Sequence, residues 1–389
     1  MAFQTLFYEI ESGRVVNIQK NFLIRKQAQK KPYSGGLDIE RVGVFYLDGD
    51  EPLEVGDVEV KKVNGWGVRL VVDKNGRYRS LERRIEKQRA KLANSDAVLF
   101  ICEGGLGDHL LQAAALLDFK AVYPEKWCGL RVHPECADVL GKVEGLDWVG
   151  VAAGVGGFPK GLVTIGGACE MMADPRGRDY GKKSIYGTML GLEKITGVAK
   201  IRPSEADYAA SLVLLEEYQR EWDRPLVGIQ FNSASGRGKS WPLNHVRALV
   251  RKIYEFSNAE AIVFGRGWEY PKAEPLGMNF SGEKTWLETY LALIVCDVVV
   301  CIDSGVLHLC RSLGKPYLGI WGGSTPEWIL GEPDRPEDLR EPMECADWLC
   351  MECVKKTAPC MSGVSPDRVY GELAGILEGI ETDEPRADA

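Results

Sequence analysis

The sequence predicts an α/β protein in which a small all-β domain precedes two Rossmann-like, doubly wound domains facing a cleft. Three observations support this prediction. Residues 1–75 contain short alternating apolar runs separated by turns rich in glycine and aspartate. From about residue 96, strand-like apolar runs alternate with amphipathic helical segments. The alternation starts again near residue 225, which indicates a second parallel sheet.

The length of 389 residues suits two or three domains. We place the all-β domain with its linker helix at 1–95 and the two α/β domains at 96–222 and 223–380, and we expect 381–389 to be a disordered tail. No apolar run is long enough to span a bilayer and the first residues do not resemble a signal peptide, so we expect a cytoplasmic protein. A net charge of −8 argues against non-specific binding to nucleic acid.

The charge is unevenly distributed along the chain. Residues 1–92 contain 18 Lys or Arg against 13 Asp or Glu, and much of this surplus lies in the basic linker helix predicted at 77–94. A solvated helix face is the favoured interpretation of that segment. Peripheral contact with a membrane surface and contacts in a homo-oligomer are alternatives that the sequence leaves open.

The first α/β half is predicted from five segments. AVLFICEGG (97–105) is a strand and DHLLQAAALLDFKAVYP (108–124) is a helix whose apolar spacing is near 3.6. A strand at 128–134, a short helix at 134–145 and a strand at 147–154 follow. A helical segment at 204–222 then connects the two halves.

The second half repeats the pattern with longer elements. Strands are expected at 225–232, 259–267, 297–305 and 315–323, and helices at 243–257, 285–296 and 306–314. A final amphipathic helix begins at the N-cap Ser365.

The strongest ligand signal lies in the second half. A strand ends at Asp303, Ser304 and Gly305 turn the chain, and a helix begins with unsatisfied backbone N–H groups that favour an anion. The next strand ends in a second turn of small residues at 322–325, which includes Ser324 and Thr325. Two such turns side by side could hold a diphosphate.

Two familiar phosphate motifs are nearly present and both fail. A P-loop that ended at Gly238 would need glycine at position 233, where the chain has Ser233. A dinucleotide fingerprint that used Gly105 and Gly107 would need a third glycine where Leu110 stands. Kinase and nicotinamide-dependent functions are therefore minor alternatives.

Eleven cysteines fall into two groups. Seven are scattered, several of them in apolar runs, and are best interpreted as small buried hydrophobic residues. The other four form a loop at 345–360 with spacing C-x4-C-x2-C-x6-C, which favours a structural metal, zinc by default, over unrelated thiols. These four are Cys345, Cys350, Cys353 and Cys360.

From residue 97 to about 380 the chain resembles the ADP-heptose:lipopolysaccharide heptosyltransferases, glycosyltransferase family nine, of GT-B fold. Five stretches carry the resemblance in order: GGLGDHLLQAAAL, LRVHPECADVLGKVEGLDWVG, VGIQFNSASGRGKSWP, FGRGWE and CIDSGVLHLCRSLGKPYLGIWGGSTP. The extra β domain and the four cysteines also resemble an autotransporter heptosyltransferase subgroup, which would make the metal iron. The resemblance implies inverting transfer from a nucleotide diphosphate sugar, an ADP-heptose-like donor, without a catalytic metal.

The resemblance implies that Asp108 is the base that takes the proton of the acceptor hydroxyl. A helix N-cap is the structural alternative for this residue. His109 is adjacent, but its side chain should point elsewhere around the helix. The first domain would then bind the acceptor, a glycan or a protein, with Gly105 and Gly107 letting it approach the backbone.

The donor would occupy the second domain. Lys239 matches the residue that neutralises the leaving diphosphate, with Arg237 assisting, and Glu269 matches the acid that binds the nucleotide ribose. Asp303 matches the acid that holds sugar hydroxyls, and His308 either frames the diphosphate turn or is a core histidine. The turn Gly322-Gly323-Ser324-Thr325 replaces the family's more usual Gly-Pro-Thr.

Three hypotheses follow from the sequence. A glycosyltransferase releases nucleoside diphosphate as it modifies an acceptor. A non-catalytic nucleotide-sugar-binding protein of the same fold binds the donor without transfer, and the altered turn and the added β domain motivate this alternative. A nucleotide-sugar epimerase changes the free donor and consumes no acceptor.

Overall fold

The computed structural model describes residues 89–151, 159–166, 181–193, 195–218, 223–233, 239–265, 277–343 and 358–382, together with the backbone of four short N-terminal strands. Strand β1 (Leu6–Glu9) pairs antiparallel with β2 (Arg14–Asn17), and β3 (Leu53–Val55) pairs antiparallel with β4 (Val58–Val60). Both pairs lie within the segment 1–75 in which the sequence predicted short strands. The sandwich or barrel expected for 1–75 and most of the linker helix lie outside the described residues, although residues 89–93 are helical.

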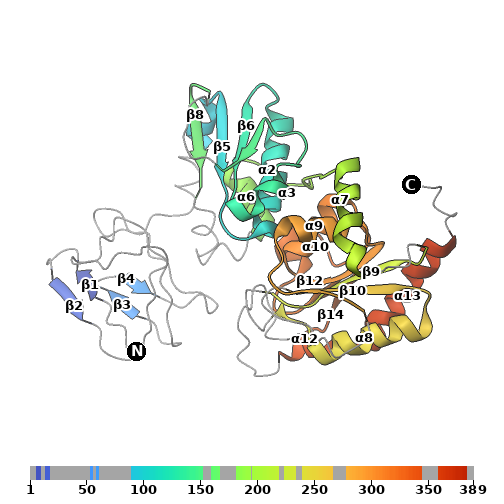
Figure 1. Ribbon diagram of the computed structural model, residues 1–389. Coiled ribbons are helices and arrows are strands. Elements are labelled where there is room, and N and C mark those ends of the chain that lie inside the picture. Colours follow the sequence, from blue (N-terminus) through green and yellow to red (C-terminus); the bar gives the residue numbers. More distant parts are fainter. Residues whose placement is uncertain are drawn as a thin grey trace.

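The first α/β domain contains a parallel four-stranded sheet with the order β7-β6-β5-β8. Its strands are β5 (Ala97–Ile101), β6 (Trp127–Arg131), β7 (Trp148–Gly150) and β8 (Leu162–Ile165). Helix α2 (Leu106–Val122) follows β5, the short α3 (Ala137–Leu140) follows β6, and α6 (Lys182–Met189) returns beneath the sheet (Figure 1). In chain order this sheet reads 3-2-1-4, so the strand order reverses between β5 and β8.

The second α/β domain contains a parallel six-stranded sheet with the order β11-β10-β9-β12-β13-β14. Read within this domain, the order is 3-2-1-4-5-6, the doubly wound dinucleotide-binding topology. The strands are β9 (Leu226–Gln230), β10 (Glu260–Gly265), β11 (Met278–Ser281), β12 (Val298–Ile302), β13 (Tyr317–Trp321) and β14 (Asp338–Arg340). The order reverses between β9 and β12, and doubly wound sheets bind their ligands outside the carboxyl ends of the strands at such a reversal.

Helices cover both faces of the second sheet (Figure 1). One face packs on α8 (Leu243–Phe256), α12 (Pro359–Gly363) and α13 (Pro366–Thr382). The Ser365 hydroxyl accepts a hydrogen bond from the Arg368 amide at 3.2 Å, as expected for the N-cap predicted there. The other face packs on α9 (Trp286–Ile294) and α10 (Gly305–Leu313), and that apolar cluster continues into the core of the first domain.

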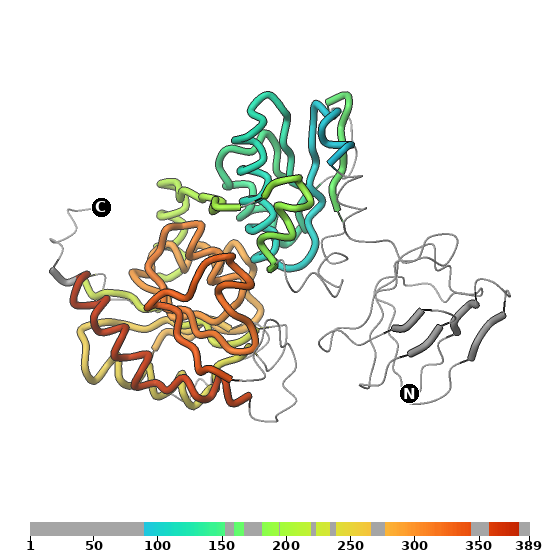
Figure 2. Tube along the Cα trace, turned by 180° about the vertical axis from the view of Figure 1, so that it is seen from behind, coloured from blue at the N-terminus to red at the C-terminus, as the bar shows by residue number. Residues whose placement is uncertain are grey.

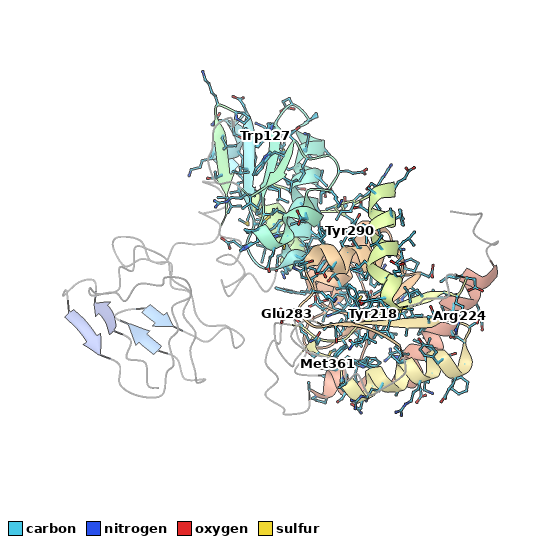
Figure 3. The ribbon with its side chains drawn as sticks, in the orientation of Figure 1. Trp127, Tyr218, Arg224, Glu283, Tyr290 and Met361 are labelled. Atoms are coloured by element: carbon cyan, nitrogen blue, oxygen red, sulfur yellow. The ribbon has the colours of Figure 1, made fainter. Side chains whose placement is uncertain are left out.

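The first domain lies against the α9 and α10 side of the second domain, and α8 and α13 lie on the far side (Figure 2). Helix α7 (Glu205–Leu215) connects the two domains and contacts α9. Asp207 accepts hydrogen bonds from Lys142 of the first domain at 2.8 Å and from the Tyr290 hydroxyl of the second at 3.1 Å, and Tyr290 lies at this junction (Figure 3). The Ser211 hydroxyl donates to the Leu291 carbonyl at 2.8 Å. Within the described ranges, no helix combines the length and apolarity needed to cross a membrane.

Candidate active site

Asp108 lies in the first turn of α2, which follows β5 and begins at the interface between the domains. The helix begins at Leu106 with Gly105 as its N-cap, so the N-cap alternative for Asp108 is wrong: this residue is the third of the helix. Its Oδ2 accepts a hydrogen bond from the Gly105 amide at 3.0 Å. Gly104 has φ +92°, and a Cβ atom there would come within 2.3 Å of Oδ2, so the loop requires glycine at 104 as well.

Two residues of α6 hold the other oxygen of Asp108. The Lys182 ammonium lies 2.5 Å from Oδ1, and the Tyr186 hydroxyl donates to the same atom at 2.9 Å. Burial raises the pKa of Asp108, but Lys182, Tyr186 and the Gly105 amide together outweigh burial and leave that pKa below its ordinary value. Asp108 is therefore an ionised carboxylate at neutral pH.

His109 points away from this carboxylate, as its place on the helix predicted. Its ring is fully buried and stacks on His133, with ring centroids 5.1 Å apart. Neither ring nitrogen has a hydrogen-bond partner among the described residues. Burial lowers the pKa of His109 to about 4, with His133 adding to the shift, so the ring is neutral at neutral pH.

The first turns of α2 and α10 contact one another across the interface between the domains. A Cβ atom on Gly107 would lie 2.4 Å from Cδ2 of His308, and one on Gly305 would lie 3.3 Å from Cβ of Leu106. Both glycines therefore let the two helices approach. The His308 ring requires glycine at 107, and this is a tertiary contact that no local sequence pattern signals.

His308 is a buried residue of this contact, with 5 % of its surface exposed. Burial lowers the pKa of His308 to about 4, although the carboxylates of Asp303 and Asp108 act in the opposite direction. The ring is neutral at neutral pH. His308 thus lies buried between the two helices and close to Asp303, and its role at the diphosphate turn stays a prediction.

Lys239 and Asp303 meet at the strand-order reversal of the second sheet. The Lys239 ammonium lies 2.5 Å from Oδ2 of Asp303, and the Ser324 hydroxyl donates to the same oxygen at 2.5 Å. Burial raises the pKa of Asp303, but Lys239, His308 and Lys182 outweigh burial and lower that pKa to about 2. The sequence placed all three residues at the donor site, and the structure brings them into direct contact.

The hydroxyl groups of Ser304 and Thr325 in the two turns cap the helices that follow them. The Ser304 hydroxyl caps α10 by accepting from the Val306 amide at 3.3 Å and donates to Oε1 of Gln230 at 2.9 Å. The Thr325 hydroxyl caps α11 (Pro326–Leu330), accepting from the Trp328 amide at 3.2 Å. The turn at 322–325 therefore lies directly beside Asp303 but uses Thr325 as a helix cap.

Several predicted site residues lie outside the described residues. These are Arg237, Glu269, Cys345, Cys350 and Cys353. Cys360 is described, and its thiol is buried at the start of α12. Within the described part of the chain, His, Cys, Asp and Glu side chains form no group of three that could hold a metal.

Comparison with known proteins matches one part of the chain to a family. Residues 184–358 match the sequence profile of glycosyltransferase family 9 (heptosyltransferase). The matched segment contains Lys239, Asp303 and α10, the second-domain half of the interface described above.

Individual relatives agree with the family 9 assignment. Lipopolysaccharide heptosyltransferase 2 of Salmonella typhimurium is 20 % identical over 127 residues, covering 30 % of this chain and 36 % of the relative. Lipooligosaccharide heptosyltransferase 2 of Haemophilus influenzae is 24 % identical over 129 residues, covering 30 % and 37 %. The matched region thus spans just over a third of the length of these curated relatives.

Solved structures resemble more of the chain than sequence relatives do. The iron-containing dodecameric glycosyltransferase TibC from enterotoxigenic E. coli superposes with a TM-score of 0.56 at 14 % identity, covering 73 % of this chain and 76 % of TibC. A family 9 glycosyl transferase from Veillonella parvula gives a TM-score of 0.54 at 15 % identity, covering 73 % and 97 %. These likenesses confirm the GT-B arrangement of two Rossmann-like domains that the sequence predicted.

Proposed function

We propose that the chain is an inverting glycosyltransferase that transfers a heptose from ADP-heptose to a hydroxyl group of a glycan or protein acceptor. The family 9 match supports the donor class, and a second TibC structure contains ADP-D-beta-D-heptose. One observation carries the proposal: the ionised carboxylate of Asp108 lies in the first turn of α2, and the Lys239–Asp303 pair lies just before α10, whose first turn contacts that of α2. In this scheme the 96–222 domain takes the acceptor and the 223–380 domain takes the donor.

The reaction requires a base on one side of the anomeric carbon and a place for negative charge on the other. Asp108 accepts the proton of the acceptor hydroxyl while the hydroxyl oxygen bonds to the anomeric carbon. The bond from that carbon to the diphosphate oxygen breaks, and the diphosphate leaves with the electron pair. Inversion follows because attack and departure occur on opposite faces of the sugar.

The second domain supplies the positive field for the leaving group. The N-terminus of α10 carries the positive end of the helix dipole, and the Lys239 ammonium is paired with Asp303 two residues before this helix begins. Because Lys239 is already paired with Asp303, the diphosphate shares this ammonium with the carboxylate. Asp303 in turn has oxygen lone pairs available for hydroxyls of the donor sugar.

A direct assay tests the function. The purified full chain is incubated with ADP-heptose and a panel of glycan and protein acceptors, and ADP release and acceptor mass are followed together. Transfer gives one ADP for each heptose added. ADP-heptose that stays intact across the panel, or that is epimerised without loss of acceptor, contradicts the proposal.

A non-catalytic nucleotide-sugar-binding protein is the second candidate, and one observation favours it. The Lys182 ammonium at 2.5 Å stabilises the anionic form of Asp108 and so makes the carboxylate a weaker base. Calorimetric binding of ADP-heptose without transfer in the same assay supports this candidate over the enzyme.

We also propose that the loop at 345–360 binds a structural metal through its four cysteines. Four thiolates suit tetrahedral iron or zinc, and TibC is described as iron-containing. Val364 lies four residues after Cys360, and its carbonyl accepts a hydrogen bond from the indole of Trp241 at 2.9 Å. Trp241 lies two residues after Lys239, so the end of the cysteine loop is connected to the Lys239 segment. Metal content measured for the purified chain and for the Cys350→Ser/Cys353→Ser variant tests the site, and full metal retention in the variant contradicts it.

A further inference from the structure

The lysine at the start of α6 has no role in the sequence motifs, yet the structure places it at the centre of the interface between the domains. Its ammonium lies 2.5 Å from Asp108, and both side chains are largely buried, with 16 % and 18 % of their surfaces exposed. Asp108 follows Gly107, which contacts His308 in the first turn of α10. Lys182 is therefore held next to the turn at which the diphosphate of the proposed donor would bind.

Helix α6 is attached to both domains. Its Ile185 and Tyr186 side chains are fully buried, and the Tyr186 ring packs edge-on against Phe100 of β5, with ring centroids 6.4 Å apart. Toward the second domain, a Cβ atom on Gly181 would lie 3.1 Å from the Trp328 carbonyl of α11. The position of Lys182 is thus fixed by contacts on both sides.

The neighbouring Lys183 strengthens the attachment to the second domain. Its ammonium lies 3.6 Å from Glu332, and the same Glu332 oxygen accepts from Arg311 of α10 at 2.5 Å. Lys183 therefore serves the domain contact, whereas Lys182 points to Asp108. The two adjacent lysines have separate partners.

The charges around Lys182 favour a change of partner when a diphosphate arrives. Lys182 acts electrostatically on Asp108, Asp303 and His308 together. The diphosphate oxygens add negative charge close to this ammonium. A diphosphate carries more negative charge than a single carboxylate, and the Asp108 carboxylate already accepts hydrogen bonds from the Gly105 amide and the Tyr186 hydroxyl.

We propose that Lys182 moves its ion pair from Asp108 to the donor diphosphate when the donor binds, and so releases Asp108 to act as the base only in the loaded protein. Tyr186 and the Gly105 amide continue to hold the carboxylate in place. This inference rests on the proposed function, because it assumes a nucleoside diphosphate at α10. It also explains how a carboxylate paired with a lysine can serve as a base.

A double-mutant cycle on ADP binding tests the proposal without requiring transfer. The variants are Asp108→Asn, Lys182→Met and the double variant, and affinity for ADP is measured by calorimetry. In Asp108→Asn, Lys182 no longer has to leave a charged partner, so ADP binds about three- to tenfold more tightly. Lys182→Met binds ADP about tenfold or more weakly, and adding Asp108→Asn to it brings no further gain.

Two further variants serve as controls. Lys182→Arg keeps the positive charge and is expected to retain ADP affinity within a few fold. Such retention shows that the loss in Lys182→Met comes from the missing charge. Lys120→Met removes a lysine that pairs with Asp147 at the same distance of 2.5 Å on the far end of α2, and it leaves ADP affinity unchanged.

The outcomes separate this inference from the proposed function. Unchanged ADP affinity in both single variants overturns the role of Lys182, even if the wild-type chain transfers heptose. An equal gain from Asp108→Asn in the presence and absence of Lys182 also overturns it. A cycle that behaves as expected in a chain that transfers nothing supports the Lys182 exchange and contradicts the enzyme.

Discussion

At the scale of single residues, the site depends on how closely the backbone approaches the Asp108 carboxylate. The Gly105 amide, Tyr186 and Lys182 all act on this group, and Gly104 leaves the space that it occupies. The neighbouring glycines Gly104 and Gly105 differ in this respect. A Cβ atom on Gly104 would meet the Asp108 carboxylate, whereas nothing lies within 4 Å of a Cβ atom on Gly105.

Gly104→Ala is expected to destabilise the chain by about 1–3 kcal/mol, because its φ is +92° and the new methyl group meets Asp108 at 2.3 Å. Displacement of the base is expected to lower the transfer rate by roughly 100-fold. Gly105→Ala, where nothing lies within 4 Å of the new Cβ atom, is the matched control for stability and should change it little. Stability that is equal in the two variants would show that the carboxylate does not need this space.

At the scale of secondary-structure elements, the central contact is between the first turns of α2 and α10. Each contributes a glycine: Gly107 accommodates His308, and Gly305 accommodates Leu106 and Trp286. The two helix N-termini are thereby brought close together, and their dipoles favour negative charge at the same place. This arrangement suits the two roles proposed above, an ionised base at Asp108 and a departing diphosphate.

Gly107→Ala is expected to force the helices apart, because a methyl group there would lie 2.4 Å from the His308 ring. Overpacking of this kind costs about 1–3 kcal/mol. Gly371→Ala in α13, where nothing lies within 4 Å, is the control and should stabilise by about 0.4–1 kcal/mol. Urea denaturation measures the free energy of unfolding of both variants. A Gly107→Ala variant as stable as the wild type would contradict the close contact between Gly107 and His308.

The elements themselves were predictable where a pattern was long. Strands β9 and β12 and helices α8 and α10 follow extended apolar runs or clear helical spacing, and they were expected within a few residues of their observed bounds. Strands β8, β11 and β14 were not predicted, because three or four residues carry no measurable period. Helix α6 was missed because its eight residues mix lysines, glycine and apolar side chains without a strong periodicity.

The residues of the candidate site were likewise predictable only where they lie in a recognisable stretch of sequence. Asp108, Lys239, Asp303 and Ser324 stand in recognisable stretches, so the sequence singled them out. Lys182 and Tyr186 lie about 75 positions after Asp108 in the chain and reach it only in the folded structure. No local pattern signals such a contact. The N-cap alternative for Asp108 failed because the helix begins two residues earlier than its apolar spacing suggested.

At the scale of the whole molecule, two doubly wound sheets direct their functional loops to one interface. The loop after β5 carries Asp108, and the loops after β9 and β12 carry Lys239 and Asp303. Two histidines, His109 and His308, are buried beside this interface in their neutral forms. The stability of the whole fold should therefore depend on pH.

Stability is expected to be full above the ordinary histidine pKa of 6.5 and to fall as the pH drops toward about 4, since the unfolded chain binds protons first. Each histidine contributes a slope of up to about 1.4 kcal/mol per pH unit. His109→Phe removes one group and should flatten the profile measured by urea denaturation between about pH 7 and 5. An unchanged slope in this variant would contradict the neutral assignment.

The central claim is that Asp108 is the base of a sugar transfer, and the kcat of Asp108→Asn tests it most directly. Asp138→Asn, an exposed carboxylate on α3 of the same domain, is the matched control. The account predicts that Asp108→Asn lowers kcat for heptose transfer by roughly 100- to 10,000-fold while ADP binds at least as tightly as before, and that the control behaves as the wild type. Transfer by Asp108→Asn at a rate close to that of the control would contradict it.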